Sequence, residues 1–208
     1  MSRSSRAPHA ADAADGGVDA SWRWIGPTVR RVRLANVRSI AVCDVQLRPL
    51  TVLVGRNGAG KRTFVDALAL VGEAMRDGLA RALEPRGGIE RLRRRSVGHP
   101  RALEITLDVR LPDWGLGIYG LVLAPRRQGG VIVRRERITL ANADEEVRAH
   151  VVRGPAKVLE STHDGLPRLA SPQMLLLPQL APHAPFDGLY RTLCGMASYR
   201  FVPDALRA

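Results

Sequence analysis

The stretch that decides the fold prediction is LTVLVGRNGAGKRT, residues 50–63. Its first five residues form a nearly continuous apolar run, which is typical of a strand buried on both faces of a sheet. A glycine-rich turn follows, and from Phe64 to Met75 apolar residues recur every three or four positions. That period predicts an amphipathic helix whose apolar face lies on the core. The sequence therefore predicts a strand, a loop and a helix in immediate succession.

The loop fits the pattern G-x-x-x-x-G-K, in which glycines let consecutive backbone N–H groups point at phosphate oxygens. The helix N-terminus adds partial positive charge, and the lysine reaches the β- and γ-phosphates. Lys61 is notable because only Lys61 and Lys157 are lysine among the 32 basic residues. We expect phosphates to be bound by Gly55, Arg56, Asn57, Gly58, Ala59, Gly60, Lys61, Arg62 and Thr63. Two alternatives are a loop for sulfate or another polyanion and a turn that merely connects strand to helix.

Arg62 departs from the motif, which has serine or threonine after the lysine. That hydroxyl normally coordinates Mg²⁺, whereas a guanidinium group cannot ligate a cation and repels it. Thr63 lies about 100° further round the helix, so it cannot simply replace the lost ligand. We therefore expect triphosphate binding with weakened Mg²⁺-dependent hydrolysis, and the sequence identifies no catalytic residue.

The remaining chain contains a tail, a block of strands and short helices. Residues 1–27 have no apolar period and predict a disordered tail. Strands are expected at 29–34 and 40–47. Residues 103–111 alternate with period two, and further strands are expected at 116–123, 131–140 and 147–158, which together predict an antiparallel sheet. Further helices are expected at 89–95, 172–180 and 186–194, and a short strand at 199–202. The predicted fold class is α/β: a central sheet with the phosphate loop and its helix, plus an antiparallel β-subdomain.

Composition limits the class of protein. Apolar residues make up 45% of the 208 residues, enough for a sizeable core, and no apolar stretch is long enough to span a membrane. Two cysteines cannot form a disulfide framework, so we expect a cytoplasmic protein. The five histidines share no ligand spacing, so no metal site is expected.

The net charge of +12 attracts nucleic acid, nucleotides or an acidic partner. The densest basic run contains Arg91, Arg93, Arg94 and Arg95, which are candidates for contacts with DNA phosphates. Stacking aromatics are missing from this run, so a solvated basic face is an equally good interpretation.

Residues 32–40, VRLANVRSI, together with residues 50–61, resemble the N-terminal half of ABC-type AAA-family ATPases, the relatives of RecF, SMC proteins and OLD nucleases. The resemblance covers about residues 28–208. It implies the N-terminal lobe of a P-loop NTPase that binds ATP and dimerises head to tail, with a role in DNA maintenance or phage defence. Family members hydrolyse ATP with an Asp–Glu pair after an apolar strand and with a signature loop from the partner.

The sequence contains neither the Asp–Glu pair after an apolar strand nor the signature loop. The resemblance therefore implies that hydrolysis would need a homodimer or a partner protein that carries the C-terminal half. The alternative is a non-hydrolysing nucleotide- or polyanion-binding module that acts through a partner protein.

Overall fold

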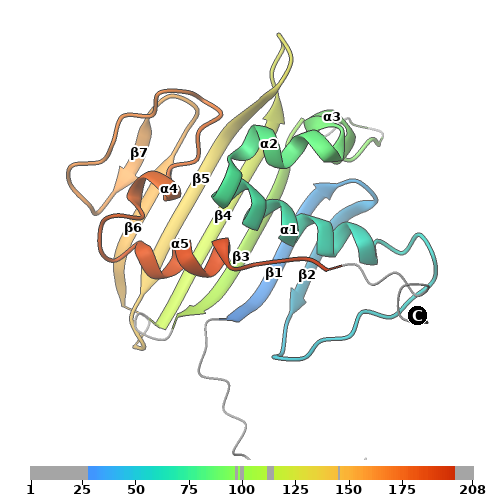
Figure 1. Cartoon of the computed structure of the whole chain (residues 1–208), viewed down its shortest axis with the longest axis horizontal. Coiled ribbons are helices and arrows are strands. Elements are labelled where there is room, and N and C mark those ends of the chain that lie inside the picture. The colour runs from blue at the N-terminus through green and yellow to red at the C-terminus, as the bar shows by residue number, and fades with distance from the viewer. Residues whose placement is uncertain (1–27, 97, 99–100, 112–114, 145, 200–208) are drawn as a thin grey trace, which may run out of the picture.

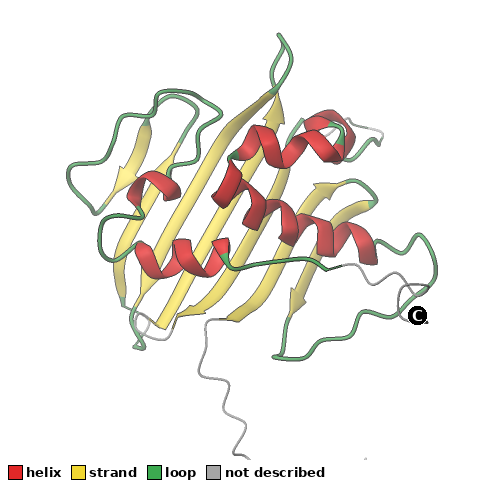
Figure 2. Cartoon of the chain, in the orientation of Figure 1, coloured by secondary structure: helices red, strands yellow, loops and turns green. Residues whose placement is uncertain are grey.

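The fold was obtained as a computed structural model, which describes residues 28–96, 98, 101–111, 115–144 and 146–199. The predicted tail and residues 200–202 of the predicted last strand lie outside these residues. Figures 1 and 2 show one twisted sheet with helices covering one of its faces. The apolar core fills the space between the two layers.

The sheet has seven strands in the order β2-β1-β3-β4-β5-β6-β7, and every neighbouring pair is antiparallel. Alternation in the sequence explains the two faces: in β3, Leu103, Ile105 and Leu107 are buried under the helices while Glu104 is exposed. The strands are β1 (Thr28–Val37), β2 (Ile40–Gln46), β3 (Leu103–Leu111), β4 (Gly115–Pro125), β5 (Val131–Ala141), β6 (Val147–Arg153) and β7 (Val158–Ser161).

The helical layer is dominated by α1 (Lys61–Asp77), which confirms the helix predicted from the apolar period. Phe64, Val71 and Met75 are buried on its sheet-facing side, and Gly78 follows its last residue. The others are α2 (Leu79–Leu83), the 3₁₀ turn η1 (Glu84–Arg86), α3 (Gly88–Leu92), α4 (Leu177–Leu180) and α5 (Asp187–Cys194). The helix predicted over 172–180 is therefore confined to its last turn.

The predicted fold class, a P-loop NTPase half-domain of ABC-ATPase type with a central sheet and a separate antiparallel β-subdomain, is wrong. The described residues form one antiparallel sheet, unlike the parallel-stranded α/β fold of that class. β1, which we expected in the central sheet, pairs directly with β3 of the predicted subdomain along seven residue pairs. The two predicted sheets are thus a single sheet.

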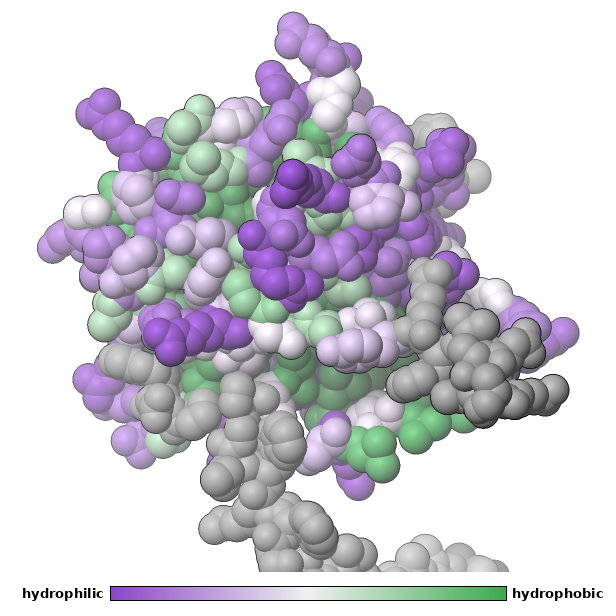
Figure 3. All heavy atoms as spheres, in the orientation of Figure 1, coloured by the Kyte–Doolittle hydropathy of each residue, from purple (hydrophilic) through white to green (hydrophobic). Residues whose placement is uncertain are grey.

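The apolar run at residues 50–54 explains the error. The run predicts a buried central strand, but it forms no strand in the structure. Leu50, Val52 and Val54 are 83%, 73% and 86% exposed, and only Leu53 packs against the core. Figure 3 shows apolar side chains at the lower right, where this segment passes after β2. Such a run becomes a buried strand only where other strands flank it, and the described residues supply none.

A buried polar cluster ties α4 to the sheet. The carboxylate of Glu136 in β5 accepts hydrogen bonds from the Tyr119 hydroxyl (3.1 Å), Arg153 Nε (3.2 Å), and the backbone N–H groups of Leu176 (2.7 Å) and Leu177 (3.0 Å). Both Glu136 and Arg153 are fully buried. Because every oxygen of the carboxylate has donors, the buried charge is compensated.

Candidate functional site

The phosphate loop predicted from the sequence lies at the N-terminal end of α1, beside the turn between β1 and β2. Gly58 and Gly60 have φ angles of 82° and 91°, which side chains disfavour. A Cβ on Gly60 would stand 3.3 Å from Cγ1 of Ile40, so the loop also approaches β2 closely. The glycines are therefore needed for the path of this chain segment.

Among the described residues, no side chain caps the first turn of α1. Its N-cap, Gly60, has no side chain to cap the helix, and the first turn contains no acidic residue. The first N–H groups of a helix have no partners within the helix, and the helix dipole makes this end positive. Arg56, Lys61 and Arg62 add three cationic side chains around the same helix end. The local field therefore favours a negatively charged group.

Lys61 is folded over the loop. Its Nζ donates hydrogen bonds to the carbonyl oxygens of Gly55 (2.5 Å) and Arg56 (2.9 Å). These bonds hold the ammonium group on the backbone of the loop, where it stays partly exposed. The ammonium group of Lys61 therefore lies on the carbonyl oxygens at the start of the loop.

Thr63 and Ser39 meet at the base of the loop. Thr63 is buried, and its Oγ1 lies 3.5 Å from the Oγ of Ser39 in the β1–β2 turn. Sequence analysis missed Ser39, because the pairing depends on where the turn between two strands is placed. Its carbonyl oxygen accepts a hydrogen bond from Arg94 (2.9 Å), so this arginine supports the turn beneath the loop.

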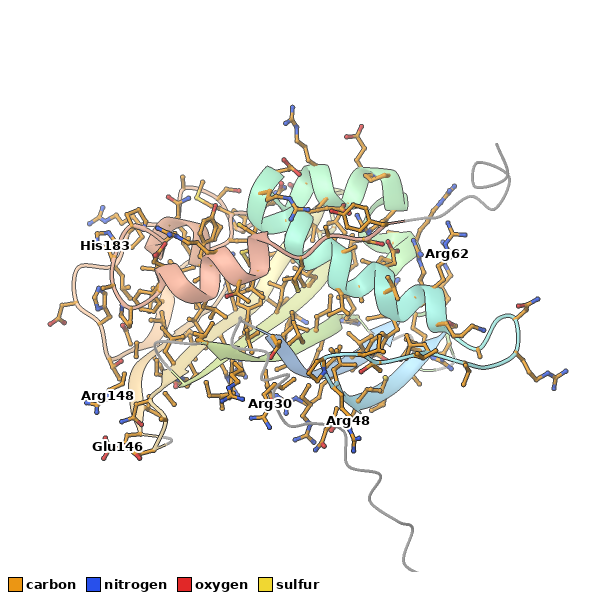
Figure 4. The ribbon with its side chains drawn as sticks, turned by 60° about the horizontal axis from the view of Figure 1, so that its bottom comes forward. Arg30, Arg48, Arg62, Glu146, Arg148 and His183 are labelled. Atoms are coloured by element: carbon orange, nitrogen blue, oxygen red, sulfur yellow. The ribbon has the colours of Figure 1, made fainter. Side chains whose placement is uncertain are left out.

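Arg62 points outward from the first turn of α1 and is exposed, as Figure 4 shows. It lines a hollow of about 430 Å³ that also contains Asp66, Glu73 and Arg86. Both acids are already paired: Asp66 with Arg38 (2.9 Å) and Arg86 (3.0 Å), and Glu73 with Arg86 (3.0 Å). The hydrogen bond from Arg86 lowers the pKa of the Glu73 carboxyl below its usual value.

These residues do not fit a Mg²⁺ site. The position of the usual hydroxyl ligand is held by a cation, and the acids in the same hollow are bound to arginines. Within the described part of the chain, no group of three or more His, Cys, Asp or Glu side chains could hold a metal.

The four arginines predicted to contact DNA have different surroundings. Arg93 pairs with Glu90 at 2.9 Å, and Arg94 supports the β1–β2 turn through its side chain and through its N–H, which donates to Asn36 (2.8 Å). Arg91 and Arg95 are exposed on either side of them. Two of the four predicted contacts therefore have structural partners.

An apolar groove adjoins the loop. It measures about 520 Å³ and is lined by residues of β2 and by residues 52–54, and Gly60 and Lys61 line it as well. Val42 of β2 is 80% exposed on its wall. β2 is the edge strand of the sheet, so its outer backbone groups are not paired within the described residues.

Comparison with known proteins finds no matching family model and no similar curated protein. None of the described helices is both long and apolar enough to cross a lipid bilayer.

Proposed function

We propose that the loop from Gly55 to Thr63 binds the phosphate groups of a nucleoside triphosphate, with ATP as the first candidate. The observation that carries the proposal is the position of Lys61, whose ammonium group is fixed on the loop at the uncapped N-terminus of α1. Backbone amides, a helix dipole and a lysine are the donors that polyphosphates require. The resemblance of residues 32–40 and 50–61 to ABC-type AAA-family ATPases supports ATP as the nucleotide.

Binding is proposed without efficient hydrolysis by this chain alone. Hydrolysis requires Mg²⁺ to neutralise charge that develops on the phosphates and a group that orients the attacking water. Arg62 replaces the hydroxyl ligand, while Asp66 and Glu73 are held by Arg38 and Arg86. These features support the role of a nucleotide-binding module over that of a self-sufficient enzyme.

The second proposed function is that of a binding module that acts through a partner protein. The exposed apolar run at residues 50–54 favours this function. Leu50, Val52 and Val54 project from an extended segment directly before the loop. A partner that covered this segment would rest on the residues that lead into Gly55, so nucleotide binding and partner binding would influence each other.

The free thiols of Cys43 and Cys194 support a reducing, cytoplasmic location.

The test is a calorimetric titration of the purified chain with ATP, GTP and ADP. Lys61→Ala is expected to weaken ATP binding by about tenfold to a hundredfold, because a hydrogen bond between charged groups contributes about 1.5–3 kcal/mol. Lys157→Ala removes the only other lysine, which is exposed, and serves as the matched control with unchanged affinity. Equal affinity of both variants, or no binding by the wild-type chain, would refute the proposal.

A further inference from the structure

The sheet face opposite the helices carries an unusual concentration of arginine. In the described residues, helices cover only one face, and Figure 4 shows the helical layer on one side with Arg30 and Arg148 on the other. This open face includes the outward residues of β3, β4 and β5. Arg135 and Arg137 alternate there with the buried Glu136 and Ile138 of the helix-covered face.

A β-bulge adds one more arginine to this face. Between β4 and β5 the register runs from Val122 opposite Arg135 to Leu123 opposite Val133, which leaves Arg134 as the extra residue. Arg134 and Arg135 are consecutive, yet both are exposed, and both line the same hollow of about 420 Å³ with Arg137. The bulge therefore brings together two side chains that a regular strand would send to opposite faces.

A second hollow of about 800 Å³ continues the basic surface. Arg134 lines both hollows, and the second also contains Arg126 and Arg127 of the β4–β5 turn and Arg101 from the segment before β3. We call these six residues the arginine surface: Arg101, Arg126, Arg127, Arg134, Arg135 and Arg137. Glu104 is the only acid that lines either hollow.

The arginine surface lacks ion pairs, unlike the other end of the same face. There, Arg31 of β1 forms a bidentate pair with Asp44 (2.7 and 2.6 Å), and Arg33 pairs with Asp108. None of the six arginines forms an ion pair with another described residue. Six exposed cations that share a single lining acid, Glu104, repel one another, and a polyanion would relieve that repulsion.

We propose that the arginine surface binds the phosphate backbone of a nucleic-acid duplex. Guanidinium forks match phosphate oxygens with two parallel hydrogen bonds. Arg135 and Arg137 are two residues apart, about 7 Å along the strand, so they reach separate phosphates. No aromatic side chain lines either hollow, so the surface lacks the stacking platforms used for single strands. The surface is independent of the proposed nucleotide loop.

The test is fluorescence anisotropy with a labelled DNA duplex and an RNA duplex of the same arbitrary sequence, measured from about 50 to 200 mM salt. The combined variant Arg134→Gln, Arg135→Gln and Arg137→Gln is expected to lower affinity at least about tenfold and to reduce the salt slope by about two to three. The matched control replaces three exposed arginines of the helical side and loops: Arg81→Gln, Arg168→Gln and Arg191→Gln. It carries the same net charge and is expected to bind as the wild type does.

Equal losses in the two triple variants would overturn the proposal, because they would show a general charge effect. Absence of binding by the wild-type chain would also overturn it. Displacement of the duplex by polyglutamate at an equal concentration of charge would overturn it too, because that result would indicate an acidic protein partner. Thermal unfolding checks that each variant is folded. The double variant Arg126→Gln and Arg127→Gln, in the β4–β5 turn, gives a second test of duplex binding. Lys61→Ala is expected to retain duplex binding, which separates this surface from the nucleotide loop.

Discussion

Two adjacent cations at the start of α1, Lys61 and Arg62, have different surroundings. Lys61 is bonded to loop carbonyls, whereas Arg62 extends outward above Asp66 and its arginine partners. A guanidinium group about 4 Å from a bound Mg²⁺ would raise the free energy of the cation by on the order of 1–4 kcal/mol or more per charge. If the loop binds a triphosphate as proposed, we expect Arg62 to weaken the dependence of that binding on Mg²⁺.

Arg62→Ser is expected to make ATP binding Mg²⁺-dependent, because it restores a hydroxyl where the motif places the cation ligand. The measurement is the ATP titration with and without Mg²⁺. In the wild-type chain, Mg²⁺ is expected to change the affinity little, and Arg81→Ser is the matched control for loss of an exposed arginine. A wild-type chain that already requires Mg²⁺ would contradict this prediction.

At the scale of elements, β4, β5, β6 and α4 are joined by the buried carboxylate of Glu136. Its donors come from Tyr119, Arg153 and the first N–H groups of α4. Burial raises the pKa of the Tyr119 hydroxyl well above its ordinary value of 10, and the negative charge of Glu136 adds to this shift. The cluster is therefore expected to make the free energy of unfolding fall at alkaline pH.

Tyr119→Phe is expected to reduce stability by about 1–3 kcal/mol at neutral pH, because Glu136 loses one donor. Above pH 10 the tyrosine ionises in the unfolded chain while it stays neutral in the folded chain, so wild-type stability falls as pH rises toward the raised pKa. The variant lacks this contribution, which amounts to at most about 1.4 kcal/mol per pH unit. Denaturant unfolding at neutral and alkaline pH measures both effects.

Tyr199→Phe is the control for this prediction, since Tyr199 is 79% exposed. It is expected to leave both the neutral stability and the alkaline slope unchanged. An alkaline slope that is the same in Tyr119→Phe and in the wild type would show that the buried hydroxyl does not titrate with unfolding.

At the scale of the whole molecule, the two edges of the described sheet differ in character. β7 at one edge is short and carries Glu160 and Ser161, which suits an edge in water. The β2 edge instead adjoins the extended residues 50–54, with three apolar side chains in solvent. Exposed apolar groups next to unpaired strand edges promote association.

Replacing Leu50→Ser, Val52→Thr and Val54→Thr together is expected to abolish concentration-dependent association of the chain, measured by sedimentation. Because these side chains are mostly exposed, the free energy of unfolding is expected to change by less than about 0.5 kcal/mol per site. Leu159→Ser and Val147→Thr, which are exposed near the opposite edge, are the controls. A wild-type chain that is monomeric at every concentration, and whose segment binds no apolar dye, would argue against an interaction surface here.

The sequence by itself determined the local features of this protein. The apolar period from Phe64 to Met75 specified α1, and the alternation after residue 102 specified antiparallel strands. Gly58 and Gly60 specified a turn whose positive φ angles are unfavourable for residues with side chains. Each of these follows from the chemistry of residues that are neighbours in the chain.

Only the tertiary structure decided what surrounds each segment. The run at residues 50–54 is apolar enough for a central strand, but burial requires flanking strands that come from distant parts of a chain. The arginine surface likewise depends on contacts between strands, because a bulge in the pairing of β4 with β5 places the side chains of Arg134 and Arg135 in one hollow. The pairing of Asp66 with Arg86 likewise joins residues from α1 and η1. Hydrophobicity and charge belong to the residue, whereas burial, register and pairing depend on contacts between segments that folding brings together.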